Sequence, residues 1–455
     1  MKNLDNKTME IARFESFFPE NARFDELEKL AIYIKDGNPC QLIGLPGVGR
    51  STTLRLLAYN KSVRLKHFNK NVQWLHFVLI DFSEASGRPF SDLLKHMLFS
   101  ISESLRERQM NEECKKVQSF VEKYTTTNED IIILDGLKQI IDYLSLEKKL
   151  TIVFLFDKFE LYIPMLTNKF FIHLKALQNR AKYRLISVFS VNRPLEEILD
   201  ETILPDAYGF LGKRNVFLPI LDEPSLNFAI SYFEKISQKK IVKDIRDIVI
   251  SQTAGHGKLT KISIEQVIAE GVLENIPTFL EGDKTVRSLL YEIWNHLTTE
   301  EQEQLKNLTR IKTIDKKDLN ENNESPYLVR SSLILNNTIS IPLLASFASY
   351  RAGRVIEKIT VSENGKEIYR GESKISDQFT NSEFFLLKLF LENKENIVER
   401  SDIIDAIWKN SKSTEGVTDQ AIDQLIFRLR KKIEKEPNNP SHIITIKGRG
   451  FKFIA

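Results

Sequence analysis

Residues 44–52 constrain the fold more than any other part of the sequence. They read Gly-Leu-Pro-Gly-Val-Gly-Arg-Ser-Thr, follow the short apolar run 41–43 and lead into the helix-like run 53–58. Two glycines separated by four residues, then a basic residue and a serine, have the spacing of a P-loop. Glycines let backbone N–H groups approach phosphate oxygens, and the following helix directs its positive end at the same oxygens. The segment therefore predicts a strand, a phosphate-binding loop and a helix.

The same loop supplies candidate ligands for a nucleotide and a metal ion. The residues expected around the phosphates of ATP or ADP are Gly44, Pro46, Gly47, Val48, Gly49, Arg50, Ser51 and Thr52. Ser51 is expected to ligate Mg²⁺. The motif has lysine at the position of Arg50, whose planar guanidinium keeps the charge but is bulkier than an ammonium group. Nucleotide binding is therefore predicted, whereas efficient hydrolysis does not follow and only a weak ATPase is expected. The alternative is a glycine-rich turn that binds nothing.

Length, charge and cysteine content limit the number of domains and the classes of protein that the sequence can belong to. A chain of 455 residues is long enough for several domains, and 42% hydrophobic and 28% charged residues are ordinary for a globular protein. The net charge of +3 identifies no partner. Two cysteines make no disulfide framework. The N-terminus has no apolar core of a signal peptide, and no apolar run approaches the roughly 18–20 residues of a membrane span. A cytoplasmic protein without a membrane partner is expected.

Strand-like and helix-like segments alternate over the first 221 residues. Strands are predicted at 41–43, 72–81, 151–157, 183–191 and 214–221. Helices are predicted at 25–34, 53–58, 90–108, 131–146 and 170–180. This alternation predicts an α/β fold, a parallel sheet with helices on both faces.

The rest of the chain divides into three further predicted parts. Residues 222–283 are helical with a break at 254–257, and 284–351 contain a capping box at 298–301, a loop at 318–325 and two short strands around Asn336-Asn337. Residues 354–379 alternate like strands with a turn at Asn364-Gly365, and 380–455 are helical before two final strands. The predicted domains are 1–221, 222–283, 284–351 and 352–455.

Four residues outside the loop are candidates for nucleotide chemistry. Asp157 ends an apolar strand, where P-loop NTPases hold Mg²⁺ with an acid, usually through water. Glu160 is the candidate general base for the attacking water, or else a solvated acid at a helix start. Arg193 follows the fourth strand and is expected to reach the γ-phosphate or to pair with a neighbouring carboxylate. His256, in the turn between helices, is the candidate for a contact to the β-phosphate.

These features resemble the STAND branch of AAA-like P-loop ATPases, which are regulatory switches. The resemblance covers about residues 15–350 and rests on residues 44–52, Asp157 with Glu160, Asn192-Arg193 and the turn 254–257. It implies a helical lid at 222–283 and a winged helix at 284–351. Archaeal replication-initiator ATPases share this layout. Arg50 departs from the pattern, and so does Lys158, because a second acid is common there.

The C-terminal run 419–433 predicts a helix with two faces. Ile422, Ile426, Leu429 and Ile433 form one apolar stripe. The residues away from that stripe are Gln420, Gln424, Phe427, Arg428 and Lys431. Glutamine and arginine on an exposed helix face can read base edges in a major groove. Residues 424–452 carry eight basic and two acidic residues, a net charge of +6, which favours phosphate contacts over a merely solvated basic helix.

This block resembles the OmpR/PhoB-type winged helix-turn-helix. The resemblance runs from about residue 354 to the end and rests on 380–387, 396–400, 406–408, 427–433 and 445–451. It implies an α+β fold whose recognition helix contacts double-stranded DNA through Gln420, Gln424, Phe427, Arg428 and Arg430. It implies wing contacts from Thr445, Lys447 and Arg449. Phe427 replaces a cation common in that family, so contact with a thymine methyl group or with a neighbouring protomer both stay open.

The two resemblances together predict a nucleotide-switched DNA-binding protein. Its ATP or ADP state is expected to control the orientation or oligomerisation of the C-terminal winged helix, with transcription regulation as the role. Two alternatives stay open: a defence sensor that oligomerises on binding a foreign partner, and a replication-initiator-like ATPase that remodels DNA. Besides DNA, the expected partners are a second copy of the chain and a protein that carries the activating signal.

Overall fold

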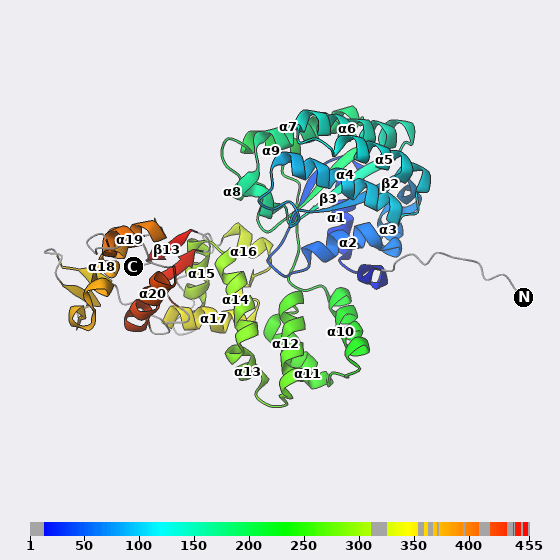
Figure 1. Cartoon of the computed structure of the whole chain (residues 1–455). Helices are drawn as coiled ribbons and strands as arrows, with labels where there is room; N and C mark the ends of the chain where they lie inside the picture. The colour runs from blue at the N-terminus through cyan, green and yellow to red at the C-terminus, as the bar shows by residue number, and fades with distance from the viewer. Residues whose placement is uncertain are drawn as a thin grey trace, which may run out of the picture. The chain divides into compact units, whose positions relative to one another are not determined.

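The computed structural model describes two compact units, Met1–Ala352 and Gly353–Ala455, called here the N-terminal and C-terminal units (Figure 1). The residues whose structure is described are 13–310, 325–353, 359–362, 367–370, 373–394, 396–408, 419–434, 440, 442–446 and 449–453. Among them, no helix combines the length and the apolar character needed to cross a membrane.

The N-terminal unit is built on a parallel sheet of five strands. The strands are β1 (Cys40–Ile43), β2 (Leu75–Asp81), β3 (Thr151–Asp157), β4 (Leu185–Val191) and β5 (Asn215–Phe217), in the spatial order β2-β3-β4-β1-β5. Every residue of β1 and β4 is buried, which requires cover on both faces of the sheet. The structure confirms the predicted α/β fold with a parallel sheet and helices around it.

Helices connect and cover these strands (Figure 1). They are α1 (Phe24–Lys35), α2 (Arg50–Tyr59), α3 (Lys61–Phe68), α4 (Phe90–Glu107), α5 (Asn111–Tyr124), α6 (Asp130–Asp142), α7 (Asn168–Arg180), α8 (Leu195–Ile198) and α9 (Leu204–Leu211). Because the strands are parallel, their carboxyl ends meet at one edge of the sheet. That edge brings the loop after β1 together with the ends of β3 and β4, although both strand ends lie more than a hundred residues after β1 in the sequence.

Some predicted boundaries were wrong for local reasons. β2 begins at Leu75 because Asn69–Trp74 form a 3₁₀ helix. β4 begins at Leu185 because Lys182 and Tyr183 adopt positive φ angles, which strands exclude. β5 has only three residues. Helix α5 was not predicted from the sequence.

Two helical groups follow the sheet within the N-terminal unit. The first contains α10 (Glu223–Ser237), α11 (Lys243–Thr253), α12 (Gly257–Glu270) and α13 (Ile276–Gly282), with the predicted break between α11 and α12. The second contains α14 (Lys284–His296), α15 (Thr299–Arg310), α16 (Pro326–Arg330), a hairpin of β6 (Ile334–Leu335) and β7 (Thr338–Ile339), and α17 (Pro342–Gly353). The predicted loop at 318–325 lies outside the described residues except for Ser325. The lid, the winged helix and their boundaries stay predictions.

Two motifs of the second group form as predicted. The Thr298 N–H donates to Glu301, and the Glu301 N–H donates to the Thr298 hydroxyl, which completes a capping box. Asn336 and Asn337 both have positive φ, as a two-residue hairpin turn requires.

The C-terminal unit has a separate apolar core. It contains β8 (Ile359–Val361), β9 (Ile368–Arg370), β10 (Ser373–Lys374), α18 (Asn381–Glu392), β11 (Ile397–Val398), α19 (Arg400–Trp408), α20 (Asp419–Ile433), β12 (Ile443–Ile446) and β13 (Gly450–Phe453). The predicted stripe Ile422, Ile426, Leu429 and Ile433 is buried, together with Leu425. The predicted turn at Asn364-Gly365 lies outside the described residues.

Candidate functional site

The glycine-rich loop joins β1 to α2 as the sequence predicts. Gly47 and Gly49 have φ angles of +80° and +108°, which side chains rarely allow. A Cβ atom on Gly44 would lie 2.8 Å from Val48 Cγ1, so this glycine allows the loop to fold tightly. The first turn of α2 has N–H groups without partners inside the helix, at the positive end of its dipole. The arrangement is that of an anion-binding loop.

Ser51 and Asp157 lie side by side, as expected for two metal ligands. The Ser51 hydroxyl donates to Asp157 Oδ1 at 2.9 Å. Asp157 is fully buried, and its Oδ2 has no hydrogen-bond partner among the described residues. Burial raises the pKa of this carboxyl group. A buried acid with an unsatisfied oxygen beside a P-loop serine fits a magnesium ion bound with nucleotide, because Mg²⁺ prefers oxygen ligands.

Arg50 and Glu160 form an ion pair at 2.7 Å between Nη2 and Oε1. Both side chains are largely buried, and Arg50 Nη1 and Glu160 Oε2 have no partner among the described residues. One donor and one acceptor of this pair are therefore buried and unsatisfied, on residues that line a cavity beside the P-loop. In this arrangement Glu160 is occupied by Arg50, so its predicted use as a general base requires the pair to separate.

The turn before α12 closes onto the P-loop. The His256 ring contacts the Pro46 carbonyl oxygen through Nε2 at 2.9 Å, and its Nδ1 accepts the N–H of Leu259. The Lys258 N–H donates to the Gly47 carbonyl oxygen at 3.0 Å. Burial lowers the pKa of His256 to about 4, which keeps the ring neutral. His256 thus holds the loop backbone and does not line the cavity that lies beside the P-loop. Its neighbours Gly255 and Gly257 do line that cavity. The β-phosphate contact of His256 stays a prediction, and it would require the ring to turn away from the Pro46 carbonyl oxygen.

Arg193 lies in a cluster of buried polar groups and not in the cavity lining. Its guanidinium pairs with Glu197 at 3.0 Å and with Glu301, and it stacks on the Tyr327 ring at 4.2 Å. Of the two contacts predicted for Arg193, the structure shows the pairing with a carboxylate, although the residue is buried and not exposed. A γ-phosphate contact would require it to leave Glu301.

The cluster around Arg193 touches the cavity through two neighbours. The Tyr327 hydroxyl donates to the Asn192 carbonyl oxygen at 2.8 Å and contacts the His296 ring at 2.7 Å. Asn192 and His296 both line the cavity. Burial lowers the pKa of His296 to about 3. Sequence patterns could not identify the contact between Tyr327 and Asn192, because the two residues are separated by 135 positions.

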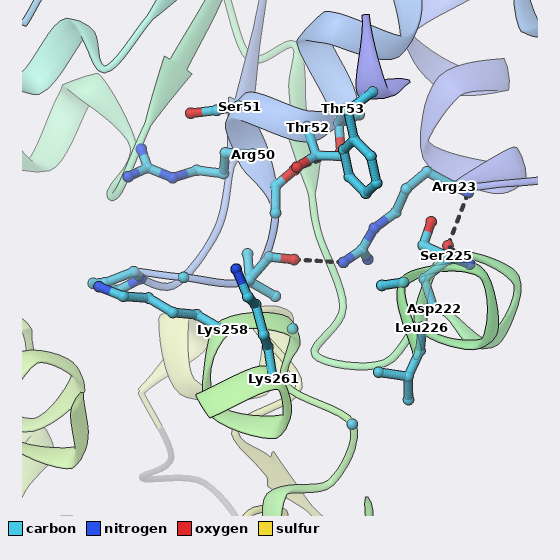
Figure 2. Close-up of a pocket in the computed structure, with 18 of the residues that line it drawn as sticks. Arg23, Arg50, Ser51, Thr52, Thr53, Asp222, Ser225, Leu226, Lys258 and Lys261 are labelled. Carbon is cyan, nitrogen blue, oxygen red and sulfur yellow. Dashed lines mark hydrogen bonds between the residues drawn. The ribbon is translucent and has the colours of Figure 1, made fainter. Parts of the chain in front are cut away.

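One cavity of about 1490 Å³ is lined by residues 46–53 of the P-loop and α2, by Glu160, and by Asn192 and His296. It is larger than most small-molecule sites. Figure 2 shows Arg50 and Ser51 on one side, Arg23 on the other, and Lys258 and Lys261 projecting from α12. The lining residues that sequence reasoning missed include Phe14, Arg23, Asn192, Lys258, Lys261 and His296.

The far part of the cavity is apolar. Phe14 and Phe18 lie at its wall with ring centroids 5.1 Å apart, and α10 and α12 contribute Leu226, Ile230, Phe233 and Ile264. Cations near the P-loop and an apolar region beyond it suit a molecule with a phosphate end and a flat aromatic end.

Among the cavity-lining cations that were not predicted from the sequence, Arg23 is the most buried. Its guanidinium donates to the Val48 carbonyl oxygen at 2.6 Å and to the Pro219 carbonyl oxygen at 2.9 Å. The backbone N–H of Arg23 donates to the carboxylate of Asp222, the N-cap of α10. Arg23 therefore connects the P-loop to the start of the helical group.

In the C-terminal unit, α20 exposes one polar face. Gln420, Gln424, Phe427, Arg428 and Lys431 are all exposed, as predicted. Their spacing of three or four residues places them on one side of the helix. The side chains that could reach a base edge are thus displayed together.

The DNA contacts predicted for this unit stay predictions, and the structure shows the surroundings of Arg430, Thr445 and Arg449. Arg430 is half-buried and donates to the Ile443 carbonyl oxygen and to the Thr445 hydroxyl, so it attaches β12 to α20. Thr445 and Arg449 are exposed in the hairpin. Lys447 lies outside the described residues.

Comparisons with known proteins agree with the C-terminal assignment. Residues 377–453 match the family "Transcriptional regulatory protein, C terminal". Over 95 residues the chain is 38% identical to regulatory protein VirG of Rhizobium rhizogenes and 33% identical to the probable transcriptional regulator ycf27 of Galdieria sulphuraria. These matches cover 21% of this chain, which spans only about a third of each relative, 34% and 36%. The predicted resemblance of this block is confirmed.

Solved structures give matches of low TM-score. The DNA-binding domain of Bacillus subtilis CssR is 30% identical and matches over its whole length, 21% of this chain, with a TM-score of 0.18. The Walker-type ATPase paby2304 of Pyrococcus abyssi is 13% identical over 74% of this chain and 97% of its own, with a TM-score of 0.43. The Aeropyrum pernix ORC1 protein in complex with DNA is 12% identical over 95% of this chain and 89% of its own, with a TM-score of 0.39. The ATPase fold of the N-terminal unit therefore rests on its own sheet order and loop geometry, and the STAND assignment stays a prediction.

Proposed function

We propose that this chain is a DNA-binding regulator whose affinity for DNA depends on the nucleotide in the N-terminal unit. One observation carries the proposal: Asn192 and His296 line the nucleotide cavity and also contact Tyr327, in the cluster that joins the sheet to α14–α16. The chain continues from this helical group through α17 into the C-terminal unit. A change at the cavity would thus act on the helical group that precedes the C-terminal unit in the chain.

The N-terminal unit would hold ATP or ADP with its phosphates on the P-loop and the first turn of α2. Ser51 and Asp157 would hold Mg²⁺, which neutralises phosphate charge when bound. The apolar region around Phe14 and Phe18 would receive the base. Arg50, Lys258 and Lys261 would supply positive charge around the phosphates.

The ion pair of Arg50 supports the expectation that hydrolysis is weak. Arg50 neutralises Glu160, so neither the cation nor the acid is fully available for chemistry. Slow hydrolysis, which leaves the nucleotide bound for long periods, suits a regulator better than rapid turnover does. The state of the nucleotide would then persist long enough to set DNA affinity.

Arg50→Lys is expected to raise ATP turnover about tenfold. The compact ammonium group reaches less far toward Glu160 and matches the residue that the motif normally carries. Phosphate release with Mg²⁺ and ATP measures the effect. Arg55→Lys is the matched control, because Arg55 lies on the same helix outside the cavity lining. Equal turnover of wild type and Arg50→Lys would show that Arg50 does not limit hydrolysis.

The DNA-binding part of the proposal is supported by the family match and by the exposed face of α20. Arg428 and Lys431 provide cations, and Gln420 and Gln424 provide amide groups for base edges. Binding through such a basic surface should weaken steeply as salt is raised.

The central experiment compares the affinity of the full chain for its duplex site without nucleotide, with ADP and with ATP. The site is first selected from random duplexes, and the affinities are measured at fixed salt. The expected difference between states is about fivefold or more, typical of coupled sites. A ligand shifts an equilibrium only by its differential affinity for the two states. Equal affinity in all three states, with nucleotide binding shown independently, would refute the switch.

A further inference from the structure

The exposed face of α20 contains one large apolar side chain. The Phe427 ring is 41% exposed, whereas the isoleucine and leucine side chains on the other face of the helix are buried. Leaving such a ring in water forgoes the free energy of burial. A partner that covers the ring in a complex would recover this free energy.

The surroundings of Phe427 are polar and basic. Gln424 precedes it by three residues on the same face, and Lys431 follows by four with its ammonium nitrogen 4.9 Å from the ring centroid. Arg428 is exposed beside it. An aromatic ring bordered by cations fits a partner that presents an apolar group between negative charges.

A second copy of this chain fits this face poorly. Two such faces in contact would bring Arg428 and Lys431 of both copies together, and like charges in close contact are unfavourable. The major groove of DNA offers the opposite arrangement, with phosphates along both edges. In that groove thymine alone among the four bases presents a methyl group.

We propose that Phe427 packs on the 5-methyl group of a thymine and so specifies that base in the DNA site. This inference rests on the proposed binding of duplex DNA through α20. Gln424 and Arg428 flank the ring and would contact the neighbouring bases by hydrogen bonds. The ring then selects thymine by shape and apolar contact, which a hydrogen-bonding side chain at this position would not do.

The test removes the methyl group and nothing else. Each thymine of the selected duplex site is replaced in turn by deoxyuridine, which keeps its base pairing and its O4 acceptor. The full chain should lose affinity about fourfold at one position, the value of one buried methyl group, and little at the others.

Two variants identify the side chain responsible. Phe427→Ala should bind the thymine duplex more weakly than wild type and should not distinguish deoxyuridine at the sensitive position. Phe385→Ala is the matched control, because Phe385 is 55% exposed but lies on α18. It should keep the sensitivity of wild type.

Three outcomes would overturn the assignment. Wild type could bind the duplex and ignore every deoxyuridine, or Phe427→Ala could keep the full sensitivity at the same base. Phe427→Ala could also dissociate a dimer in the absence of DNA, which would assign the ring to a second copy. If wild type binds no duplex in any nucleotide state, the proposed function fails together with this inference.

Discussion

Glu301→Gln is expected to destabilise the N-terminal unit by about 3 kcal/mol, the lower end of the cost of removing one partner from a buried ion pair. The side chains of Arg193 and Glu301 are 10% and 5% exposed. Glutamine keeps the length and the hydrogen-bonding oxygen that accepts the Thr298 N–H, so the capping box survives. The substitution therefore removes one negative charge and leaves Glu197 as the carboxylate that pairs with the buried guanidinium.

Glu197→Gln is the matched control for this prediction. Glu197 pairs with the same guanidinium, but its side chain is 42% exposed. An exposed pair contributes about 1 kcal/mol or less, so this variant should remain close to wild type. Hydrogen exchange read by mass spectrometry can follow α14–α16 separately from the C-terminal unit.

The two variants together distinguish local opening from general unfolding. Glu301→Gln should increase exchange in α14–α16 and in the end of β4, with no change in α18–α20. Equal exchange in Glu301→Gln and Glu197→Gln would show that the charge of Glu301 does not hold the cluster. Loss of protection throughout the chain would show that the effect is not confined to this contact.

The parts of the fold that were predictable are encoded by near neighbours. The spacing of glycines in residues 44–52, the apolar runs of the strands and the stripe on α20 each need only a short window of sequence. The strand order needs more, but five parallel strands separated by helices leave few alternatives. Helix α5 was missed because many of its residues are exposed and its apolar residues are few.

The candidate site was predictable only in part, because its partners are remote in sequence. Ser51 was predicted as a metal ligand from the P-loop spacing, and Asp157 from its place at the end of an apolar strand. The pairing of Arg50 with Glu160 joins residues separated by 110 positions, and that of Arg193 with Glu301 by 108. No local pattern encodes such contacts. They depend on which ends of strands and helices the fold brings together.

The same limit applies to the choice between neighbouring arginines on α20. Sequence resemblance gave Arg428 and Arg430 the same expected role. The structure separates them, because Arg430 is directed to the backbone of β12 while Arg428 stays exposed. Two residues along a helix differ by about 200° in direction, so one of the pair can face the core side when the other faces outward.

The second large effect is expected at Gly47, where the P-loop touches the turn before α12. Gly47 has a φ angle of +80°, and a Cβ atom would lie 2.9 Å from both His256 Cε1 and Lys258 Cβ. Neither neighbour can move freely. The His256 ring is hydrogen-bonded to the Pro46 carbonyl oxygen, and the Lys258 backbone N–H donates to the Gly47 carbonyl oxygen. Alanine at this position must therefore displace the loop or α12.

Gly47→Ala should lower the affinity for ADP about tenfold or more, because both the phosphate loop and its closure by α12 are disturbed. Titration with a fluorescent ADP analogue measures this affinity. Gly271→Ala is the matched control: Gly271 ends the same helix with a φ of +66°, and a Cβ atom there meets nothing within 4 Å. It carries a similar backbone cost without the steric clash. Equal losses in both variants would assign the effect to backbone strain alone, whereas unchanged affinity in Gly47→Ala would show that nucleotide binds without the closed contact. A loss of ADP affinity confined to Gly47→Ala would show that the contact between the P-loop and the start of α12 is required for nucleotide binding.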